Sequence, residues 1–394
     1  MTAPTTRVVF VDDDPLVLRA LQRMFRNDAS FDCAFAPDGH DALVAMRENT
    51  PDIVVSDFQM PGMDGRALLT EVQTRHPDTV RIILTGETDA RRVFRAVPVA
   101  HQFLAKPTHP RDLVAVLDRA RELRRLLNSE ALRALVGSDG RLPSPPTAYV
   151  RLTQYLSDPE VPLGDVAELV EQDVALTAQI TRFGASAFIA VPSSVRSVRG
   201  IITYLGADMI KTLVLANEVF HSYVADSSVL DVDEVQRHAI LTARIAEALM
   251  EEPADRSDAL LAGMLHDVGA LLLAARAPEL VREVRAHAAN KGICIHEAEH
   301  ELLGASHAEV GAYLMGIWGL PDNVIWAIAH HHELPHGGGP KLDVDTAVHI
   351  AASLAHGCEA PCLDVIRLAE REVLPRLPQY ERIASRLRGD AELH

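Results

Sequence analysis

Four short apolar segments near the start of the chain each end in residues that can do chemistry. The segments are residues 8–11, 53–56, 81–84 and 103–105, and the polar residues that follow them are Asp12, Asp13, Asp57, Thr85 and Lys106. Because helical patterns separate the segments, we expect parallel strands in a doubly wound α/β sheet of five strands. The carboxyl ends of such strands meet at one crevice, where ligands bind. The sequence therefore predicts that three carboxylates, a hydroxyl and an ammonium lie together.

This combination of groups suits phosphoryl transfer. Three carboxylates in one crevice repel one another, so they need a cation or a bound proton. Mg2+ binds a few carboxylates, keeps several waters and pairs with phosphate oxygens. One carboxylate could attack a phosphoryl group, while the metal, Lys106 and the Thr85 hydroxyl stabilise the new oxygens. The alternative is that these acids are ordinary strand-end or helix-capping residues.

The first part of the chain resembles the receiver domain of a two-component response regulator. The matching segments are Val11–Pro15, Ser56–Gly65, Leu84–Gly86 and Phe103–Pro107. The resemblance implies a flavodoxin-like fold and a sensor histidine kinase as partner. It also implies that the kinase phosphorylates Asp57.

The same resemblance assigns roles to the other residues of the crevice. Asp13, Asp57 and the backbone carbonyl of Gln59 would bind Mg2+, and Asp12 would bind it through a water. Lys106 would contact the phosphoryl group. Thr85 and Phe103 would form the switch pair that responds to phosphorylation.

Size and composition are consistent with a signalling protein of several domains. A chain of 394 residues suggests two domains or three, and a hydrophobic fraction of 48% is ample for their cores. The net charge of −17 argues against broad affinity for nucleic acid, although a local basic patch stays open. The cysteines, which show no zinc-like pairing and are expected to be reduced thiols, are Cys33, Cys294, Cys358 and Cys362.

Two features favour a cytoplasmic protein. Residues 1–7 are polar and lead into a strand, so no N-terminal signal is expected. The longest apolar stretch, residues 259–277, contains His266, Asp267 and Arg276. Charges at that depth are unfavourable in a membrane, so we predict a buried core helix and no membrane partner.

Helical patterns dominate the rest of the chain, and no strand period returns beyond residue 146. The predicted helices are residues 16–26, 41–48, 67–75 and 90–97 in the first part, and 148–156, 164–170, 176–183, 195–205, 207–223, 232–250, 258–275, 278–290, 295–303, 307–318, 322–332, 345–355 and 364–369 in the second. A further helix follows Pro110 with apolar residues at Leu113, Val116, Ala120, Leu123 and Leu127. This spacing fits either a receiver helix that packs on its own sheet or a dimerising helix.

Histidines and acids are scattered through the predicted helices of the second part. The candidate ligands for a second metal, a transition metal, are Glu234, His238, His266, Asp267, His307, His331 and His332. Carboxylates and imidazoles from several helices are typical of metal sites in helical bundles. The alternative is that these histidines are capping or hydrogen-bonded core residues. For His266 and Asp267, placed inside an apolar helix, an unpaired charge would be costly.

Residues from Leu142 to about Ala355 resemble an HDOD domain, an output relative of the HD-type phosphohydrolases. The matching segments are residues 176–180, 186–188, 202–206, 263–269 and 304–321. We expect a receiver domain over residues 1–127, a linker over 128–146, an all-α HDOD domain over 147–356 and a C-terminal helical tail over 357–394. In the linker, we expect the last receiver helix to continue until a Pro-rich segment ends it.

The related HD-GYP phosphodiesterases open cyclic dinucleotides at a site of two or three metals. The seven candidate ligands have counterparts in that pattern, but its late Asp is Ala352 here and the Lys of its His-Asp motif is Ala270. The Gly-rich motif after His332 is short of its Tyr. Loss of the carboxylate lowers metal affinity, and loss of the ammonium removes phosphate stabilisation, so we do not expect turnover.

Two functions follow. In the first, phosphorylation of Asp57 changes how a non-catalytic HDOD output domain contacts a downstream protein or a second copy of the chain. In the second, the protein is a phosphorylation-gated, metal-dependent phosphodiesterase of the HD-GYP type. A DNA-binding regulator is disfavoured because the chain is acidic and lacks a basic recognition helix.

Overall fold

The structure is a computed structural model. It describes the whole chain except residues 1–4, 87–98, 127–142, 156–161, 172–176, 178–179, 182–194, 196, 223–227, 337–340, 356–362 and 393–394. The chain divides into two compact units: residues 1–147 with 313–319 form the first, and the remaining residues form the second. The predicted boundaries at residues 127, 147 and 356 themselves stay predictions.

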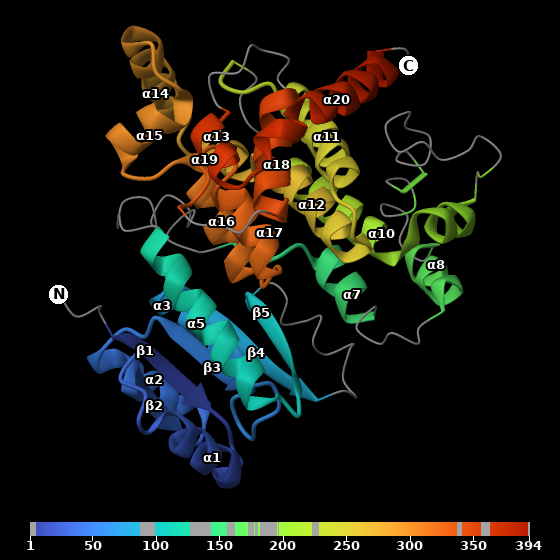
Figure 1. Cartoon of the computed structure of the whole chain (residues 1–394). Helices are drawn as coiled ribbons and strands as arrows, with labels where there is room; N and C mark the ends of the chain where they lie inside the picture. Colours follow the sequence, from blue (N-terminus) through green and yellow to red (C-terminus); the bar gives the residue numbers. More distant parts are fainter. Residues whose placement is uncertain are drawn as a thin grey trace. The chain divides into compact units, whose positions relative to one another are not determined.

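A parallel sheet forms the centre of the first unit (Figure 1). Its five strands have the order β2-β1-β3-β4-β5. The strands are β1 (Thr6–Val11), β2 (Phe31–Ala36), β3 (Ile53–Asp57), β4 (Val80–Gly86) and β5 (Gln102–Lys106). Each strand pair is parallel. This confirms the predicted receiver-like α/β fold.

Helices cover both faces of this sheet. The helices are α1 (Pro15–Phe25), α2 (Gly39–Glu48), α3 (Gly65–Arg75) and α5 (Pro110–Leu126). On one face, side chains of α2 and α3 pack with Val9, Val54 and Ile83. On the other face, Phe25 of α1 stacks on Phe10, and Arg121 of α5 lies over the ring of Phe31. Successive residues of a strand point to opposite faces, so Val9 packs against α2 and α3 while Phe10 packs against α1.

The helix after Pro110 buries most of its apolar positions. Leu113, Val116 and Ala120 are buried within the chain, as expected of a helix that packs on its own sheet. Leu127 and the predicted helix 90–97 lie outside the described residues, as does most of the predicted linker.

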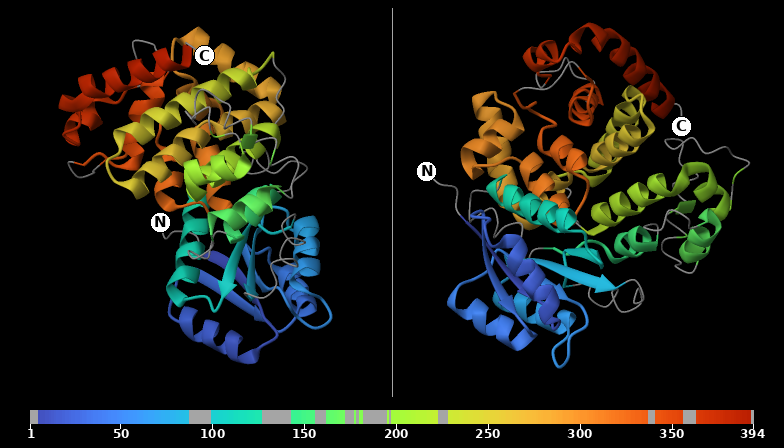
Figure 2. Two further views of the ribbon diagram at one scale, coloured as in Figure 1. Left: turned by 90° about the vertical axis from the view of Figure 1, so that its right-hand side faces the viewer. Right: turned by 60° about the horizontal axis from the view of Figure 1, so that its bottom comes forward.

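From residue 147 on, the described part of the chain is helical throughout, and it includes residues 313–319 of the first unit. Its elements are α7 (Thr147–Tyr155), α8 (Leu163–Glu171), α10 (Val198–Ser222), α11 (Val232–Leu249), α12 (Pro253–Leu265), α13 (Val268–Arg276), α14 (Pro278–Lys291), α15 (Ile295–Leu303), α16 (His307–Ile317), α17 (Asp322–Ala329), α18 (Val344–Ala355), α19 (Val365–Glu370), the short 3-10 helix η1 (Leu374–Arg376) and α20 (Leu377–Glu392). Helices α11, α12, α17 and α18 pack against one another, and α14 pairs with α15 in a hairpin (Figures 1 and 2).

Two predicted helices are too long, and both errors concern histidines. The predicted helix 258–275 is two helices, because α12 ends at Leu265 and α13 begins at Val268. Asp267 at the junction has φ −95° and ψ 10°. The predicted helix 322–332 ends at Ala329, which leaves His330–His332 beyond it. In contrast, the predicted break at Gly206 is confirmed, since this glycine has φ +81° within α10.

One described segment has the length and composition of a membrane span. It covers residues 253–276, and 72% of its most apolar window is buried inside the structure. The junction between α12 and α13 interrupts it at His266 and Asp267. These features are those of core helices.

Candidate functional site

The predicted acidic crevice is present at the carboxyl ends of the strands. Asp12 follows β1, Asp57 ends β3 and Lys106 ends β5. The Lys106 ammonium lies 2.8 Å from Oδ2 of Asp12 and 2.8 Å from Oδ1 of Asp57. Oxygens of Asp12, Asp13 and Asp57 lie within 4.8 Å of one another. An all-oxygen donor set of this kind fits Mg2+.

Local backbone contacts fix the two buried carboxylates. Oδ1 of Asp12 accepts a hydrogen bond from the backbone N–H of Asp14, and Oδ1 of Asp57 accepts one from that of Phe58, each at 2.9 Å. The start of α3 lies against the same loop, because N of Gly65 donates to O of Phe58 at 3.0 Å. A Cβ at Gly65 would overlap the carbonyl oxygen of Asp57. Glycine is therefore required there.

Burial and neighbouring charges set the protonation of this site. Burial raises the pKa of the Asp57 carboxyl, and the hydrogen bond from Lys106 only partly opposes it; the charge of Asp12 raises it further. Burial alone would lower the pKa of Lys106, but its hydrogen bonds to Asp12 and Asp57 raise it above its usual range. The ammonium therefore stays charged beside the carboxylates.

The predicted switch residues lie on neighbouring strands. Phe103 of β5 pairs with Ile83 of β4, and Thr85 pairs with Ala105. Because side chains alternate along a strand, Thr85 and Phe103 share one face of the sheet. Phe103 packs partly buried against the core on that face. Gln59 lies exposed in the loop after β3.

A second cluster surrounds Asp267, at the junction of α12 and α13. Oδ2 of Asp267 lies 3.2 Å from Nε2 of His266 and 4.0 Å from Nε2 of His238. Oδ1 lies 3.5 Å from Nε2 of His307 and 3.6 Å from Nε2 of His331. The two oxygens of one carboxylate therefore face two different pairs of imidazoles.

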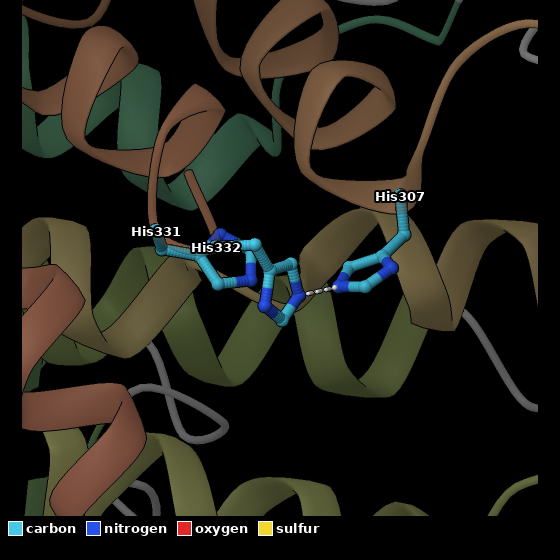
Figure 3. Close-up of side chains that lie close together, drawn as sticks. All are labelled: His307, His331 and His332. Carbon is cyan, nitrogen blue, oxygen red and sulfur yellow. Dashed lines mark hydrogen bonds between the residues drawn. The ribbon is translucent and has the colours of Figure 1, made fainter. Parts of the chain in front are cut away.

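Hydrogen bonds orient several of these rings. Nδ1 of His266 lies 2.7 Å from O of Gly263, and Nδ1 of His331 lies 2.8 Å from O of Ile328. Each Nδ1 therefore donates to a carbonyl, and each Nε2 is left toward Asp267. His332 brings its Nε2 to 2.9 Å from Nε2 of His307 (Figure 3).

His266, His307 and His331 are buried and the other three residues of the cluster are partly buried, which shifts the pKa values of the cluster. Burial alone would lower the pKa of His307, but Glu299 and Asp267 raise it to about 10. Burial holds the pKa of His331 and of His332 well below the usual range, with neighbouring imidazoles adding to the shift. Burial would raise the pKa of Asp267, but His266 and His307 hold it well below the usual range.

The histidine cluster fits a transition metal. Two sets of three residues each offer ligand atoms within 4.8 Å of one another: His238, His266 and Asp267 in one, and His307, His331 and His332 in the other. Within the described part of the chain, Nε2 of His331 is buried and makes no hydrogen bond. Imidazole and carboxylate donors with a free, inward nitrogen suit Zn2+, Fe2+ or Mn2+.

One predicted ligand lies apart from the others, and one buried neighbour of the cluster was not predicted. Glu234 is exposed in the first turn of α11, and the structure does not group it with the six other candidates. Glu299 of α15, which was not among the predicted ligands, is buried and bonds to His307. The signal for Glu299 in the sequence was its spacing, because it stands about one helical turn after His296. His296 is buried as well. Ala270 lies in α13 and Ala352 in α18, without side chains that could replace the missing Lys and Asp.

Comparisons with known proteins give two family matches along the chain. The family model for the response regulator receiver domain matches residues 8–118, and that for the HDOD domain matches residues 142–334. A DNA-binding transcriptional regulator, NtrC of Klebsiella pneumoniae, is 38% identical over 111 residues, which is 28% of this chain and 24% of NtrC. An uncharacterized protein of Treponema pallidum is 26% identical over 198 residues, 50% of this chain and 38% of that protein. The chain thus spans well under half the length of these relatives.

A solved structure resembles the larger part of the chain. It is an HDOD domain protein with unknown function from Geobacter sulfurreducens, 25% identical, with a TM-score of 0.51. The match covers 71% of this chain and 95% of that one.

Proposed function

We propose that this two-component response regulator, whose chain joins a receiver domain to an HDOD domain, accepts a phosphoryl group on Asp57. Its HDOD domain then serves as a non-catalytic output module. The partner in the first step is a sensor histidine kinase, as the receiver homology implies. The partner in the second is a downstream protein or a second copy of the chain. The proposed location is the cytoplasm.

The observation that carries this proposal is the position of Lys106 between Asp12 and Asp57. A nucleophilic carboxylate needs a cation nearby to accept charge from the incoming phosphoryl oxygens. Asp13, Asp57 and the Gln59 carbonyl would hold Mg2+, with Asp12 behind a water. The bound ion would neutralise charge on the phosphoryl oxygens.

The chain's own residues perform the remaining steps. A carboxylate oxygen of Asp57 forms a bond to phosphorus as the bond from phosphorus to the kinase histidine nitrogen breaks. Lys106 moves its hydrogen bonds from the carboxylates to the phosphoryl group. The Thr85 hydroxyl donates to a phosphoryl oxygen, and Phe103 on the same face repacks. The result is a shift between two populations of the receiver.

Hydrogen exchange on the full chain tests the coupling. We expect Mg2+ and acetyl phosphate to change exchange in residues 147–334 of the wild type, and to leave the Asp57→Asn protein unchanged. Asp38→Asn is the matched control, because Asp38 caps α2 and asparagine caps equally well. Changes confined to the receiver would refute a phosphorylation-controlled HDOD module.

A second proposal concerns the histidine cluster, because Asp267 faces imidazoles on both sides. We propose that His238, His266, Asp267, His307, His331 and His332 bind a transition metal. The alternative function, hydrolysis of a cyclic dinucleotide, needs groups that Ala270 and Ala352 lack. We therefore propose binding without turnover.

Elemental analysis and an assay separate these possibilities. Wild-type protein purified without chelator should carry transition metal, and His331→Ala should carry much less. His336→Ala is the control, because His336 bonds to Arg367 and lies outside both ligand sets. Metal-free wild type that also takes up no added Zn2+ or Mn2+ would contradict the site. Turnover of a cyclic dinucleotide with Mn2+ or Fe2+ would instead favour the enzyme.

A further inference from the structure

Glu299 makes an unusual double contact with His307. Its Oε2 accepts a hydrogen bond from the backbone N–H of His307 at 2.8 Å and lies 2.6 Å from ring Nδ1 of the same residue. Both side chains are buried, Glu299 at 6% exposure and His307 at 5%. A buried carboxylate is costly unless it is bonded in this way. The two contacts with His307 therefore offset the cost of burying the Glu299 carboxylate.

The turn between α15 and α16 creates this contact. Gly304 ends α15 in the left-handed conformation, with φ +79°, and α16 begins at His307. The chain reverses within those residues, so Glu299 on the inner side of α15 meets the first N–H of α16. Glu309 of α16 in turn accepts from the backbone N–H of Ser306 at 2.8 Å. The turn is held from both sides.

We propose that Glu299 is a positioning residue that fixes the ring of His307 for metal binding, an inference that rests on the metal site proposed above. The bond to Nδ1 holds a proton on that nitrogen, so a bound metal would replace the proton on Nε2. Nε2 then faces the cluster, 3.5 Å from Oδ1 of Asp267 and 2.9 Å from Nε2 of His332 (Figure 3). A carboxylate behind a histidine ligand also raises the basicity of that ligand.

The structural alternative is that Glu299 only caps α16. A cap uses the backbone N–H and has no need of Nδ1. The two roles differ in what the conservative variant Glu299→Asp does. Asp keeps a negative charge near the helix terminus, but its shorter side chain cannot hold the ring as Glu does. A cap would tolerate this change, whereas a positioning residue would not.

The same helix supplies a matched control. Glu301 is exposed and pairs with His287 of α14 and Lys291, each at 2.6 Å. Glu301→Gln removes the same charge from the same helix without touching the cluster. Any general effect of α15 on the fold should therefore follow Glu301→Gln as well.

The experiment measures Zn2+ affinity by competition with a chromophoric chelator, on the full chain. We expect Glu299→Gln and Glu299→Asp to bind Zn2+ about 10- to 100-fold more weakly than wild type. Glu301→Gln should stay within about twofold of wild type. Circular dichroism at the same temperature checks that each variant is folded.

A second, metal-free measurement reads the ring directly. In protein labelled with 15N-histidine, His307 should show a protonated Nδ1 in the wild type and in Glu301→Gln, and lose that signature in Glu299→Asp, whose side chain is too short to reach the ring. If the wild type binds Zn2+ and both Glu299 variants bind it equally well, the positioning role is wrong while the metal site stands. If the wild type binds no metal, the metal site itself fails and this inference fails with it.

Discussion

The Lys106 ammonium lies 2.8 Å from Oδ1 of Asp57, although the two residues end strands that are not neighbours. Strand β4 separates β3 from β5, so only the common direction of the strands brings the two groups to one crevice. The cation offsets the repulsion between Asp57 and Asp12. It lies where the proposed phosphoryl transfer to Asp57 needs a cation.

Replacing Lys106 with methionine should slow phosphorylation and should increase the thermal stabilisation that Mg2+ gives the protein. Without the ammonium, one donor to the phosphoryl oxygens is lost, which costs on the order of 100-fold in rate. The acids of the crevice would then have only a metal ion to offset their charge, so Mg2+ should raise the Tm of Lys106→Met more than that of wild type. Acetyl phosphate labelling rates and thermal melts measure the two effects.

The control for this variant is Lys211→Met. Lys211 pairs with Asp208 one turn away in α10, at 2.7 Å. Exposed pairs of this type contribute little, so neither labelling nor the Mg2+ response should change. Equal behaviour of Lys106→Met and the wild type would contradict the role given to Lys106.

Cys33 should be a poor nucleophile until strongly alkaline pH. Burial in β2, with the charges of Asp32 and Asp28, raises the pKa of this thiol to about 12. The thiolate is the reactive form, so folded protein at pH 8 should react with iodoacetamide about tenfold or more slowly than unfolded protein. Mass spectrometry of the peptide that contains Cys33 gives the rate. If the reaction rate of folded protein stops rising with pH near pH 9, the pKa of Cys33 is not raised as described.

Two Gly-to-Ala substitutions in the helical unit should have opposite signs. A Cβ at Gly269 would overlap the carbonyl oxygen of His307 and approach N of Gly311, so Gly269→Ala should cost about 1–3 kcal/mol. At Gly389 in α20 no atom lies within 4 Å of the added Cβ. Gly389→Ala should therefore be stabilising by up to about 1 kcal/mol. Urea midpoints measure both, and destabilisation by Gly389→Ala would contradict the open space found around Gly389.

The sheet and its acidic crevice could be predicted because four of the five strands contain an apolar run that a polar residue follows. The direction of the chain then determines where those residues meet. The histidine cluster was predictable only in part. Apolar composition continues on both sides of His266 and Asp267, from Leu260 through Leu273, and no Pro separates the two helices. A pattern of composition therefore predicts one long helix where the structure has two.

Glu299 and Glu234 show why the ligand shell was harder to predict. Glu234 stands four residues before His238, a spacing that places two side chains on one helix face. It nevertheless lies in the exposed first turn of α11. Glu299 is in a helix with many polar residues, where a carboxylate normally faces water. Only the turn after Gly304, where the chain reverses between α15 and α16, brings Glu299 to His307.

The most direct test of the account is to map the phosphorylated residue chemically. Full-length protein is incubated with acetyl phosphate and Mg2+, and borohydride then reduces any aspartyl phosphate to homoserine, which peptide mass spectrometry locates. We expect homoserine at position 57 in the wild type and in Asp38→Asn, and none in Asp57→Asn. Homoserine at another aspartate of the wild type, or label that persists in Asp57→Asn, would contradict it.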